Sequence, residues 1–416
     1  MPQLTGLWRN SQFVSLWAAQ SVSHLGSQIT LLALPLTAVL VLGASPAEMG
    51  LLGAAEFAPW LLVGLFAGVW VDRLHRRPIL VATDLGRALL LLSVPLAAML
   101  GMLSLPLLYT VAFLTGVLSV LFEVAYNAFL PSLVRRDELV EGNSKLLASA
   151  SAAEIAGPGI AGGLVQMVTA PVAVALDAVS YVVSALFVSR IRTAEPPATP
   201  TSERSVVREA REGLGALLKD PLLRSLVIAS MSSNLLFAVH TTLRVLYATR
   251  DLGLEPALLG LVFGMGSVGG LPAAFLAGRA ARRFGLGPTI VATEVLIALG
   301  GLCFPLAAGP VPVVVAVLAL GMLLVSLGVM TYIITVGSLR QSITPHRLLG
   351  RVSASARFIS RSAIPVGAIA GGLLGEWLGL RLTLGITSAA SLLVALFLLL
   401  SPIGPLREPP PPHDEG

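Results

Sequence analysis

The stretch Gly68-Val-Trp-Val-Asp-Arg-Leu-His-Arg-Arg-Pro78 places five ionisable side chains within eleven residues. It lies between an apolar run at 47–71 and another that begins at residue 78. Such density of charge is unusual here, because only 12% of the residues in this chain are charged. One acid, Asp72, stands among three arginines. The stretch therefore indicates a short charged loop between two long apolar segments.

Hydropathy along the whole chain predicts an integral membrane protein. The 416 residues are 55% hydrophobic, and the mean hydropathy of +0.87 lies outside the range of ordinary soluble domains. Apolar runs long enough to cross about 30 Å of hydrocarbon as helices recur between short polar breaks. We expect an all-α polytopic protein with twelve membrane helices, near residues 11–42, 47–71, 78–101, 105–130, 145–168, 171–189, 221–249, 256–278, 287–308, 311–338, 352–377 and 382–402.

The placement of basic residues predicts the orientation. With the N-terminus in the cytosol, nearly all Lys and Arg residues fall in inward loops or tails, whereas Arg250 and Arg381 face outward. This bias predicts a multi-pass protein of the bacterial inner membrane with both termini in the cytosol. We divide the chain into a six-helix half, a cytosolic linker that is Pro/Ser/Thr-rich and then helical, a second six-helix half and a cytosolic tail, at 1–189, 190–219, 220–402 and 403–416.

Several classes of protein are disfavoured by the sequence. The first residues lack the pattern of a cleaved signal peptide, so we expect the first apolar segment to remain as a helix. A single cysteine, Cys303, excludes an internal disulfide and a cysteine metal cluster. The basic residues form no continuous stripe for nucleic acid, and no GxxxxGK[ST] loop is present. We therefore expect no nucleic-acid partner, no metal and no cofactor.

The two halves repeat each other at a fixed shift. A shift of 210 residues superposes Pro46, Ala47 and Gly50 on Pro256, Ala257 and Gly260, and the run 81–84 on 291–294. For the run 161–164 we align 370–373, at a shift of 209. Because each repeat has an even number of helices, the repeats are parallel. That arrangement is typical of a transporter fold whose binding site lies between the halves near the middle of the membrane.

The stretch at 68–77 resembles motif A of the major facilitator superfamily, a glycine, three residues, Asp-Arg and then a basic pair. The runs VATDLGRA at 81–88 and LPSLVRRDELVEGNS at 130–144 resemble the macrolide-efflux and enterobactin-exporter branch of that superfamily. The resemblance implies the major facilitator fold, with two pseudo-symmetric six-helix halves. His75 departs from the motif, in which a second glycine is usual, and the fourth segment lacks the arginine of a proton-relay motif.

The resemblance also implies a cytosolic gate in which Asp72 contacts the start of the segment 352–377. Asp72 ends an inward-running helix, where the helix dipole disfavours an acid and favours a cationic partner. A second interpretation is that the whole loop only orients the neighbouring helices. We expect the gate to comprise Gly68, Asp72, Arg73, Arg76, Arg77, Arg357 and Arg361.

Polar residues inside membrane segments are costly and indicate function. The resemblance implies a cavity lined by the first, fourth, seventh and tenth helices, whose candidates are Gln20, His24, Gln28, Glu123, Asn127, Asn234, His240 and Tyr332. The alternative for each is an interhelical hydrogen bond. We select Glu123 and Glu154 for proton exchange, because a desolvated carboxylate can bind a proton near neutral pH.

Other charged residues in the segments are assigned to structural roles. Asp84, Arg87 and Glu294 lie near segment ends, so we assign them to the loop networks, and Asp177 to a contact between helices. Small residues and proline permit close packing and bending. We expect this role for Gly157, Pro158, Gly162, Gly163, Gly371 and Gly372.

The sequence thus favours a transporter, not an enzyme. We expect a monomeric secondary exporter of an amphipathic small organic molecule, such as a drug, macrolide or siderophore, working by alternating access in membrane lipid and driven by protons. An importer or a lysolipid flippase of the same fold is the alternative. A membrane-embedded enzyme is disfavoured because the five histidines are scattered, and a non-transporting receptor is disfavoured by the paired halves.

Overall fold

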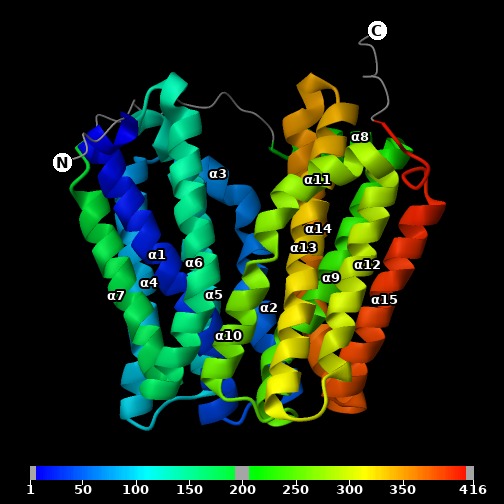
Figure 1. Cartoon of the computed structure of the whole chain (residues 1–416). Coiled ribbons are helices and arrows are strands. Elements are labelled where there is room, and N and C mark those ends of the chain that lie inside the picture. Colours follow the sequence, from blue (N-terminus) through cyan, green and yellow to red (C-terminus); the bar gives the residue numbers. More distant parts are fainter. Residues whose placement is uncertain (1–5, 193–205, 409–416) are drawn as a thin grey trace. The chain divides into compact units, whose positions relative to one another are not determined.

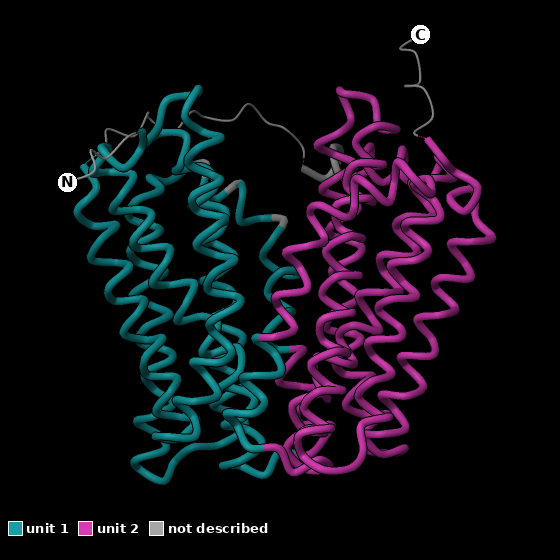
Figure 2. Tube along the Cα trace, viewed as in Figure 1, with its two compact units in different colours: residues 1–44, 55–201, 255–264 teal, residues 45–54, 202–254, 265–416 magenta. Residues whose placement is uncertain are grey.

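A computed structural model describes residues 6–192 and 206–408, apart from the side chains of Leu65, Val69, Asp72 and residues 206–210. Every regular element within these ranges is helical. The described chain forms two compact units, shown in Figure 2. Unit 1 comprises residues 1–44, 55–201 and 255–264, and unit 2 comprises residues 45–54, 202–254 and 265–416.

Unit 1 is built mainly from the first repeat (Figure 1). Its helices are α1 (Ser11–Leu36), α3 (Gly64–Asp72), α4 (Arg76–Met99), α5 (Leu105–Leu133), α6 (Leu139–Met167) and α7 (Ala170–Ser189). Single turns lie at η1 (Gly6–Arg9) and η3 (Arg136–Glu138), and a π-helical turn, η2 (Thr37–Val41), extends α1. In this unit α1 packs against α6 and α7, and α4 packs against α5 and α7.

Unit 2 repeats this arrangement with the second half of the chain. Its helices are α8 (Val206–Lys219), α9 (Pro221–Arg250), α11 (Gly270–Phe284), α12 (Leu286–Leu306), α13 (Val311–Ile343), α14 (Leu349–Leu378) and α15 (Leu380–Leu400), with a single turn at η4 (His346–Leu348). Here α9 packs against α14 and α15, and α12 packs against α13 and α15. The same four pairings therefore recur in both units, as a duplicated chain requires.

Two helices divide between the units. Residues 46–54 of α2 (Pro46–Leu62) belong to unit 2, and residues 256–264 of α10 (Pro256–Ser267) belong to unit 1. Each unit therefore contains the first turns of one helix from the other sequence repeat.

Glycine pairs permit these two helix starts to pack closely. In unit 1 a Cβ on Gly162 would lie 2.2 Å from the carbonyl oxygen of Pro256 and 2.9 Å from Cα of Gly260. In unit 2 a Cβ on Gly372 would lie 2.7 Å from the carbonyl oxygen of Pro46 and 2.8 Å from Cα of Gly50. Gly162 and Gly372 thus occupy equivalent places. The shift stays at 210 through this region, and the alignment at 209 was wrong because neighbouring glycines made the register ambiguous.

Local sequence explains where the first helix of each repeat begins. The side chain of Asn10 accepts hydrogen bonds from the backbone N–H groups of Gln12 and Phe13 at 3.0 and 3.2 Å. Asp220, 210 residues later, accepts from Leu222 and Leu223 at 2.8 and 3.0 Å. Such caps satisfy N–H groups that the first turn of a helix leaves without partners.

Among the described residues, ten helical segments are long and apolar enough to cross a membrane. They correspond to ten of the twelve expected segments, and most bounds agree within a few residues. The other two expected segments are the α2–α3 pair, interrupted at Val63, and α6, which is rich in glycine, alanine and serine. The larger deviations are at α6, which begins six residues before the expected 145, and at α10–α11, which continues six residues beyond the expected end at 278.

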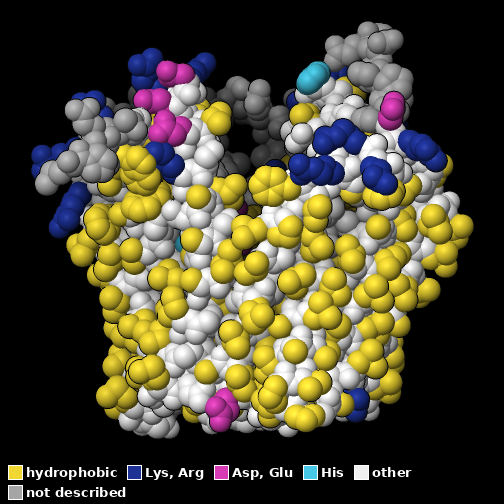
Figure 3. All heavy atoms as spheres, viewed as in Figure 1, with side chains coloured by type: hydrophobic (Ala, Val, Ile, Leu, Met, Phe, Trp, Pro, Cys, Tyr) yellow, Lys and Arg dark blue, Asp and Glu magenta, His cyan; other side chains and the backbone are white. Residues whose placement is uncertain are grey.

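Surface composition follows the same pattern in each unit. Hydrophobic side chains cover the visible flanks of the helices, and Lys and Arg side chains gather near one end of each unit (Figure 3). The exposed basic residues include Arg9, Arg135 and Arg136 of unit 1 and Arg282 and Arg283 of unit 2. Broad exposure of apolar side chains is expected where lipid, and not water, surrounds a protein.

Candidate functional site: buried polar networks

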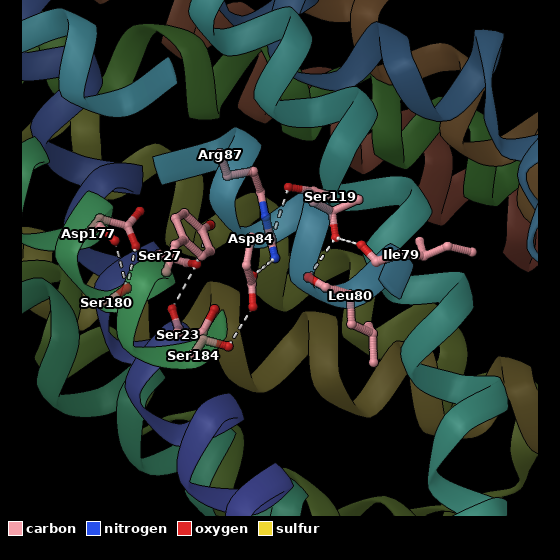
Figure 4. Close-up of polar contacts among 12 residues, drawn as sticks. Ser23, Ser27, Ile79, Leu80, Asp84, Arg87, Ser119, Asp177, Ser180 and Ser184 are labelled. Carbon is pink, nitrogen blue, oxygen red and sulfur yellow. Dashed lines mark hydrogen bonds and ion pairs between the residues drawn. The ribbon is translucent and has the colours of Figure 1, made fainter. Parts of the chain in front are cut away.

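An ion pair lies buried inside unit 1. Arg87 donates from Nη2 to Asp84 Oδ1 one turn earlier on α4, and the two residues are 5% and 0% exposed. Ser184 of α7 donates to the other carboxylate oxygen at 2.7 Å (Figure 4). The assignment of these residues to a loop network was wrong, because the face of α4 that carries them packs against α5 and α7.

Aromatic rings hold the arginine in place. The guanidinium carbon of Arg87 lies 4.3 Å from the ring centre of Phe122 on α5 and 4.1 Å from that of Tyr181 on α7. The hydroxyl group of Tyr181 is 2.9 Å from Ser27 Oγ on α1. A guanidinium group between two rings gains cation–π attraction that strengthens when water is excluded. One arginine therefore links α4, α5 and α7, and Tyr181 extends the network to α1.

Asp177 of α7 lies beside this network and is 0% exposed. Ser180 Oγ is 2.9 Å from its Oδ1 and 2.8 Å from its backbone carbonyl oxygen. A Cβ on Gly26 of α1 would lie 2.4 Å from Asp177 Oδ1. Only glycine leaves room for the acid where α1 crosses α7.

Unit 2 has a buried acid at the equivalent place on α12. Glu294 is 1% exposed, lies 210 residues after Asp84, and has a contact of 2.7 Å with Ser233 Oγ on α9. The position equivalent to Arg87 is Ile297. Glu294 therefore has no arginine one turn away. Because Glu294 is buried, its assignment to a loop network was also wrong.

Two further contacts tie α9 to its neighbours in unit 2. Ser230 Oγ is 2.9 Å from the hydroxyl group of Tyr332 on α13. His240 Nε2 is 2.9 Å from Ser388 Oγ and 3.2 Å from Thr387 Oγ1 on α15. Thr387 is equivalent to Asp177, so the second repeat places a neutral hydroxyl where the first has a carboxylate.

Comparison with known proteins identifies the family. The model of the Major Facilitator Superfamily matches residues 16–368. The chain belongs to this superfamily. It is a transporter with the all-α major facilitator fold and spans the membrane several times. The resemblance inferred from motif A and the fold class are thereby confirmed.

Relatives within the superfamily include efflux proteins. The chain is 28% identical over 415 residues to the multidrug efflux pump Tap of Mycolicibacterium fortuitum, and this alignment covers 95% of this chain and 97% of Tap. It is 26% identical over 220 residues to macrolide efflux protein A of Streptococcus pyogenes, covering 52% and 54% of the two chains. In structure it is similar to the nucleoside transporter NupG, with a TM-score of 0.79, 12% identity and coverage of 93% and 99%. The last likeness concerns the fold alone.

The cavity candidates of this superfamily member have different surroundings. In unit 1 Gln20 is 4% exposed and Gln28 packs against Gly157, whereas His24 and Asn127 are exposed. In unit 2 Asn234 donates to the carbonyl oxygen of Ser360 at 3.1 Å, and His240 and Tyr332 have the contacts described above. The three unit 2 candidates thus make interhelical hydrogen bonds. Whether any of them also meets a substrate stays a prediction.

The proton-exchange candidates lie at exposed positions. The side chains of Glu123 on α5 and Glu154 on α6 are both exposed, while Asp84, Asp177 and Glu294 are fully buried. The depth of Asp84 and Glu294 was missed from the sequence, whereas Asp177 was expected at a contact between helices and lies where α1 crosses α7. A usable signal was the 210-residue shift, because it matches Asp84 with Glu294 at the end of two matching runs, 81–84 and 291–294.

The gate candidates lie on α3, on the loop after it, at the start of α4 and in the first half of α14. Gly68, Arg76 and Arg77 are half-buried and Arg73 is exposed, and Arg77 donates to the carbonyl oxygen of Ser189. The side chain of Asp72 lies outside the described part of the structure. In unit 2 Arg357 and Arg361 are exposed. Arg351 pairs with Glu212 of α8, so the linker helix binds the start of α14.

The packing candidates differ in how much room they leave. A Cβ on Gly157 would lie 2.3 Å from Cβ of Gln28, and one on Gly371 would lie 2.9 Å from Cα of Val239. Gly162 and Gly372 form the crossings described above, and Pro158 is buried. Gly163 has no atom within 4 Å of an added Cβ, so it faces open space.

Proposed function

We propose that this transporter is a secondary active exporter that moves an amphipathic small organic molecule out of the cell by alternating access, driven by proton entry. The observation that carries the proposal is the likeness to the multidrug efflux pump Tap over nearly the whole of both chains. The partial likeness to macrolide efflux protein A supports the same direction of transport.

The buried networks give the proposal a physical basis. Each unit holds ionisable groups inside apolar helices, and such groups in membrane proteins serve substrate or proton pathways. We propose that the polar residues of α1, α5, α9 and α13 contact substrate, among them Gln20, His24, Asn127 and Asn234. Glu123 and Glu154 remain our candidates for proton exchange, and both side chains are exposed in unit 1.

The proposal includes a charged gate and an orientation. Asp72, with Arg73, Arg76 and Arg77, would hold the cytosolic side closed in one state through Arg357 and Arg361. The termini would lie in the cytosol of a bacterial cell, in the inner membrane, and the protein would work as a monomer surrounded by lipid. The orientation can be tested with a variant lacking Cys303, into which single cysteines are placed in loops and labelled from outside the cell.

Transport by reconstituted protein tests the function. Proteoliposomes would be given labelled macrolide, cationic dye, siderophore, nucleoside or lysolipid, with a pH gradient imposed in either direction. We expect accumulation of an amphipathic organic substrate that reverses with the gradient. Uptake of nucleoside alone would identify an importer, and transfer of lysolipid between leaflets would identify a flippase. Transport that is indifferent to the pH gradient would contradict proton coupling.

A further inference from the structure

Glu294 has an unusual hydrogen-bond environment in unit 2. Its Oε1 is 2.7 Å from Ser233 Oγ, and the same Oγ is 2.9 Å from the carbonyl oxygen of Ala229, one turn earlier on α9. A serine hydroxyl has a single proton to donate. When that proton goes to Ala229, as serine hydroxyls in helices commonly arrange, the contact with Glu294 needs a proton from the carboxyl group.

Charge near Glu294 is sparse. Among the described residues no Lys, Arg or His makes an ion pair with it, and Ile297 occupies the place of an arginine. An ionised carboxylate in apolar surroundings without a cation is strongly disfavoured, and a proton removes the charge.

The groups that face Glu294 from each packed helix are largely neutral. They are the hydroxyl of Ser233 on α9 and the phenol of Tyr332 on α13, which is itself bonded to Ser230. Arg340 lies eight residues further along α13 than Tyr332, and the like charge of Arg357 on α14 acts on it. The buried polar side chains of α15 are hydroxyls, among them Thr387 and Ser391. The arginines of α11, at 279, 282 and 283, are exposed.

Asp84 provides a contrast within the same chain. It is equally buried, but Arg87 neutralises it, and Ser184 donates to it without a competing contact to a carbonyl. The contacts of Asp84 therefore suit an ionised carboxylate. The two repeats place one fixed ion pair and one acid without a cation at equivalent positions.

We propose that Glu294 is a proton-binding site of the transporter, which takes up and releases one proton as unit 2 rearranges. Asp84 is its ionised counterpart and holds its helices together. The role of Glu294 in coupling rests on the proposed proton-driven function, whereas its ability to bind a proton does not.

Infrared spectroscopy of the full-length protein tests proton binding directly. A C=O stretching band of buried protonated carboxylic acid is expected in the wild type near neutral pH. Its intensity should fall in Glu294→Gln, and any remainder is assigned to Asp177, which is also fully buried. The double variant Asp84→Asn with Arg87→Met is the matched control, because it removes the equivalent acid without leaving a buried charge unpaired, and it should leave the band in place. Ser233→Ala removes the hydrogen-bond acceptor and should shift the band, so the assignment does not depend on one variant. A band that persists unshifted and with unchanged intensity in Glu294→Gln and Ser233→Ala overturns the inference.

Transport measurements separate this inference from the proposed function. Glu294→Gln should reduce gradient-driven accumulation about tenfold, within the usual range of coupling between two sites, while substrate exchange without a gradient persists. If the wild type transports without using a proton gradient yet shows the Glu294 band, the coupling function fails and the proton site stands. If the wild type is proton-driven and Glu294→Gln retains full dependence on the gradient, the coupling role of Glu294 fails and the function stands.

Discussion

Gln166 of α6 accepts a hydrogen bond from the backbone N–H of Ala257, in the first turn of α10, at 3.0 Å. In unit 2 Glu376 of α14 accepts one from Ala47, in the first turn of α2, at 3.3 Å. Both partners are related by the shift of 210 residues. A side chain thus caps the first turn of α10 and of α2, one turn beyond the glycine pair at which each helix packs. It satisfies an N–H group that the start of a helix leaves without a hydrogen-bond partner.

The glycine crossing in unit 1 should tolerate no side chain. Gly162→Ala brings Cβ against the carbonyl oxygen of Pro256, so we expect a loss of about 1–3 kcal/mol in the free energy of unfolding, as in other overpacked sites. Gly163→Ala is the control, because its Cβ meets open space. It should be neutral or stabilising by up to about 1 kcal/mol, since alanine is the better helix former. Unfolding in detergent micelles measures both, and equal effects would contradict the crossing.

Most of the helices can be predicted from the sequence, because membrane segments follow a simple physical rule. A run of apolar residues must form a helix in lipid, so the expected segment 311–338 is found within α13 and 171–189 within α7. The start of α6 was predicted late, because Glu141 and Lys145 marked a loop by their charge. In the structure they pair with each other at 2.9 Å, one turn apart on the helix.

The candidate site was harder to predict because depth and facing direction depend on packing. Asp84 and Glu294 lie about two turns from the start of their helices, where a small error in boundary separates a loop from the interior. Sequence gives the residues of a helix face but not the neighbour that face meets. The arginine between Phe122 and Tyr181 could not be predicted, because its partners come from three helices.

Removing the arginine of the buried pair should destabilise unit 1 strongly. Arg87→Met leaves Asp84 as a buried charge without a cation, which typically costs about 3–5 kcal/mol. Asp84→Asn combined with Arg87→Met should recover most of this loss, because neither charge remains. Arg135→Met is the control, since its ion pair with Asp137 is exposed and should contribute less than about 1 kcal/mol. A loss below about 1 kcal/mol for Arg87→Met would show that water reaches the pair.

Low pH should release the N-terminal turn η1 from α6. Hydrogen bonds from Lys145 and from the backbone N–H of Leu7 lower the pKa of Glu141 below its usual value. A lowered pKa stabilises the folded state above the unfolded value of about 4.3, and this contribution disappears as pH falls through the lower folded value. Lys145 Nζ lies 4.1 Å from the Trp8 ring, so fluorescence of Trp8, taken as the difference from Trp8→Phe, should change below about pH 4.

A variant tests the origin of that acid transition. Glu141→Gln should show the altered Trp8 signal already at pH 7 and should have no transition at low pH. Asp137→Asn, which changes an exposed acid of the same loop, should titrate like the wild type. A transition that persists in Glu141→Gln would assign it to another group.

The exposed acids of α5 and α6 should determine how transport varies with pH if they exchange protons with water. We expect Glu123→Gln or Glu154→Gln to flatten the pH profile of substrate transport in proteoliposomes. Glu48→Gln, in the first turn of α2, is the control and should keep the profile of the wild type. An unchanged profile in both Glu123→Gln and Glu154→Gln would remove these residues from the proton pathway.

The proposed gate depends on a single carboxylate. Orientation in the membrane accounts for the arginines of the stretch 68–78, but not for Asp72, which lies at the carboxyl end of α3 where the helix dipole disfavours it. If Asp72 holds a closed state through the arginines of α14, Asp72→Asn should lower transport about fivefold or more and reduce the population closed on that side. Spin-label distances across the gate would measure the population. Asp137→Asn controls for the loss of a loop acid, and equal transport and populations in all three proteins would leave the stretch with only its role in orientation.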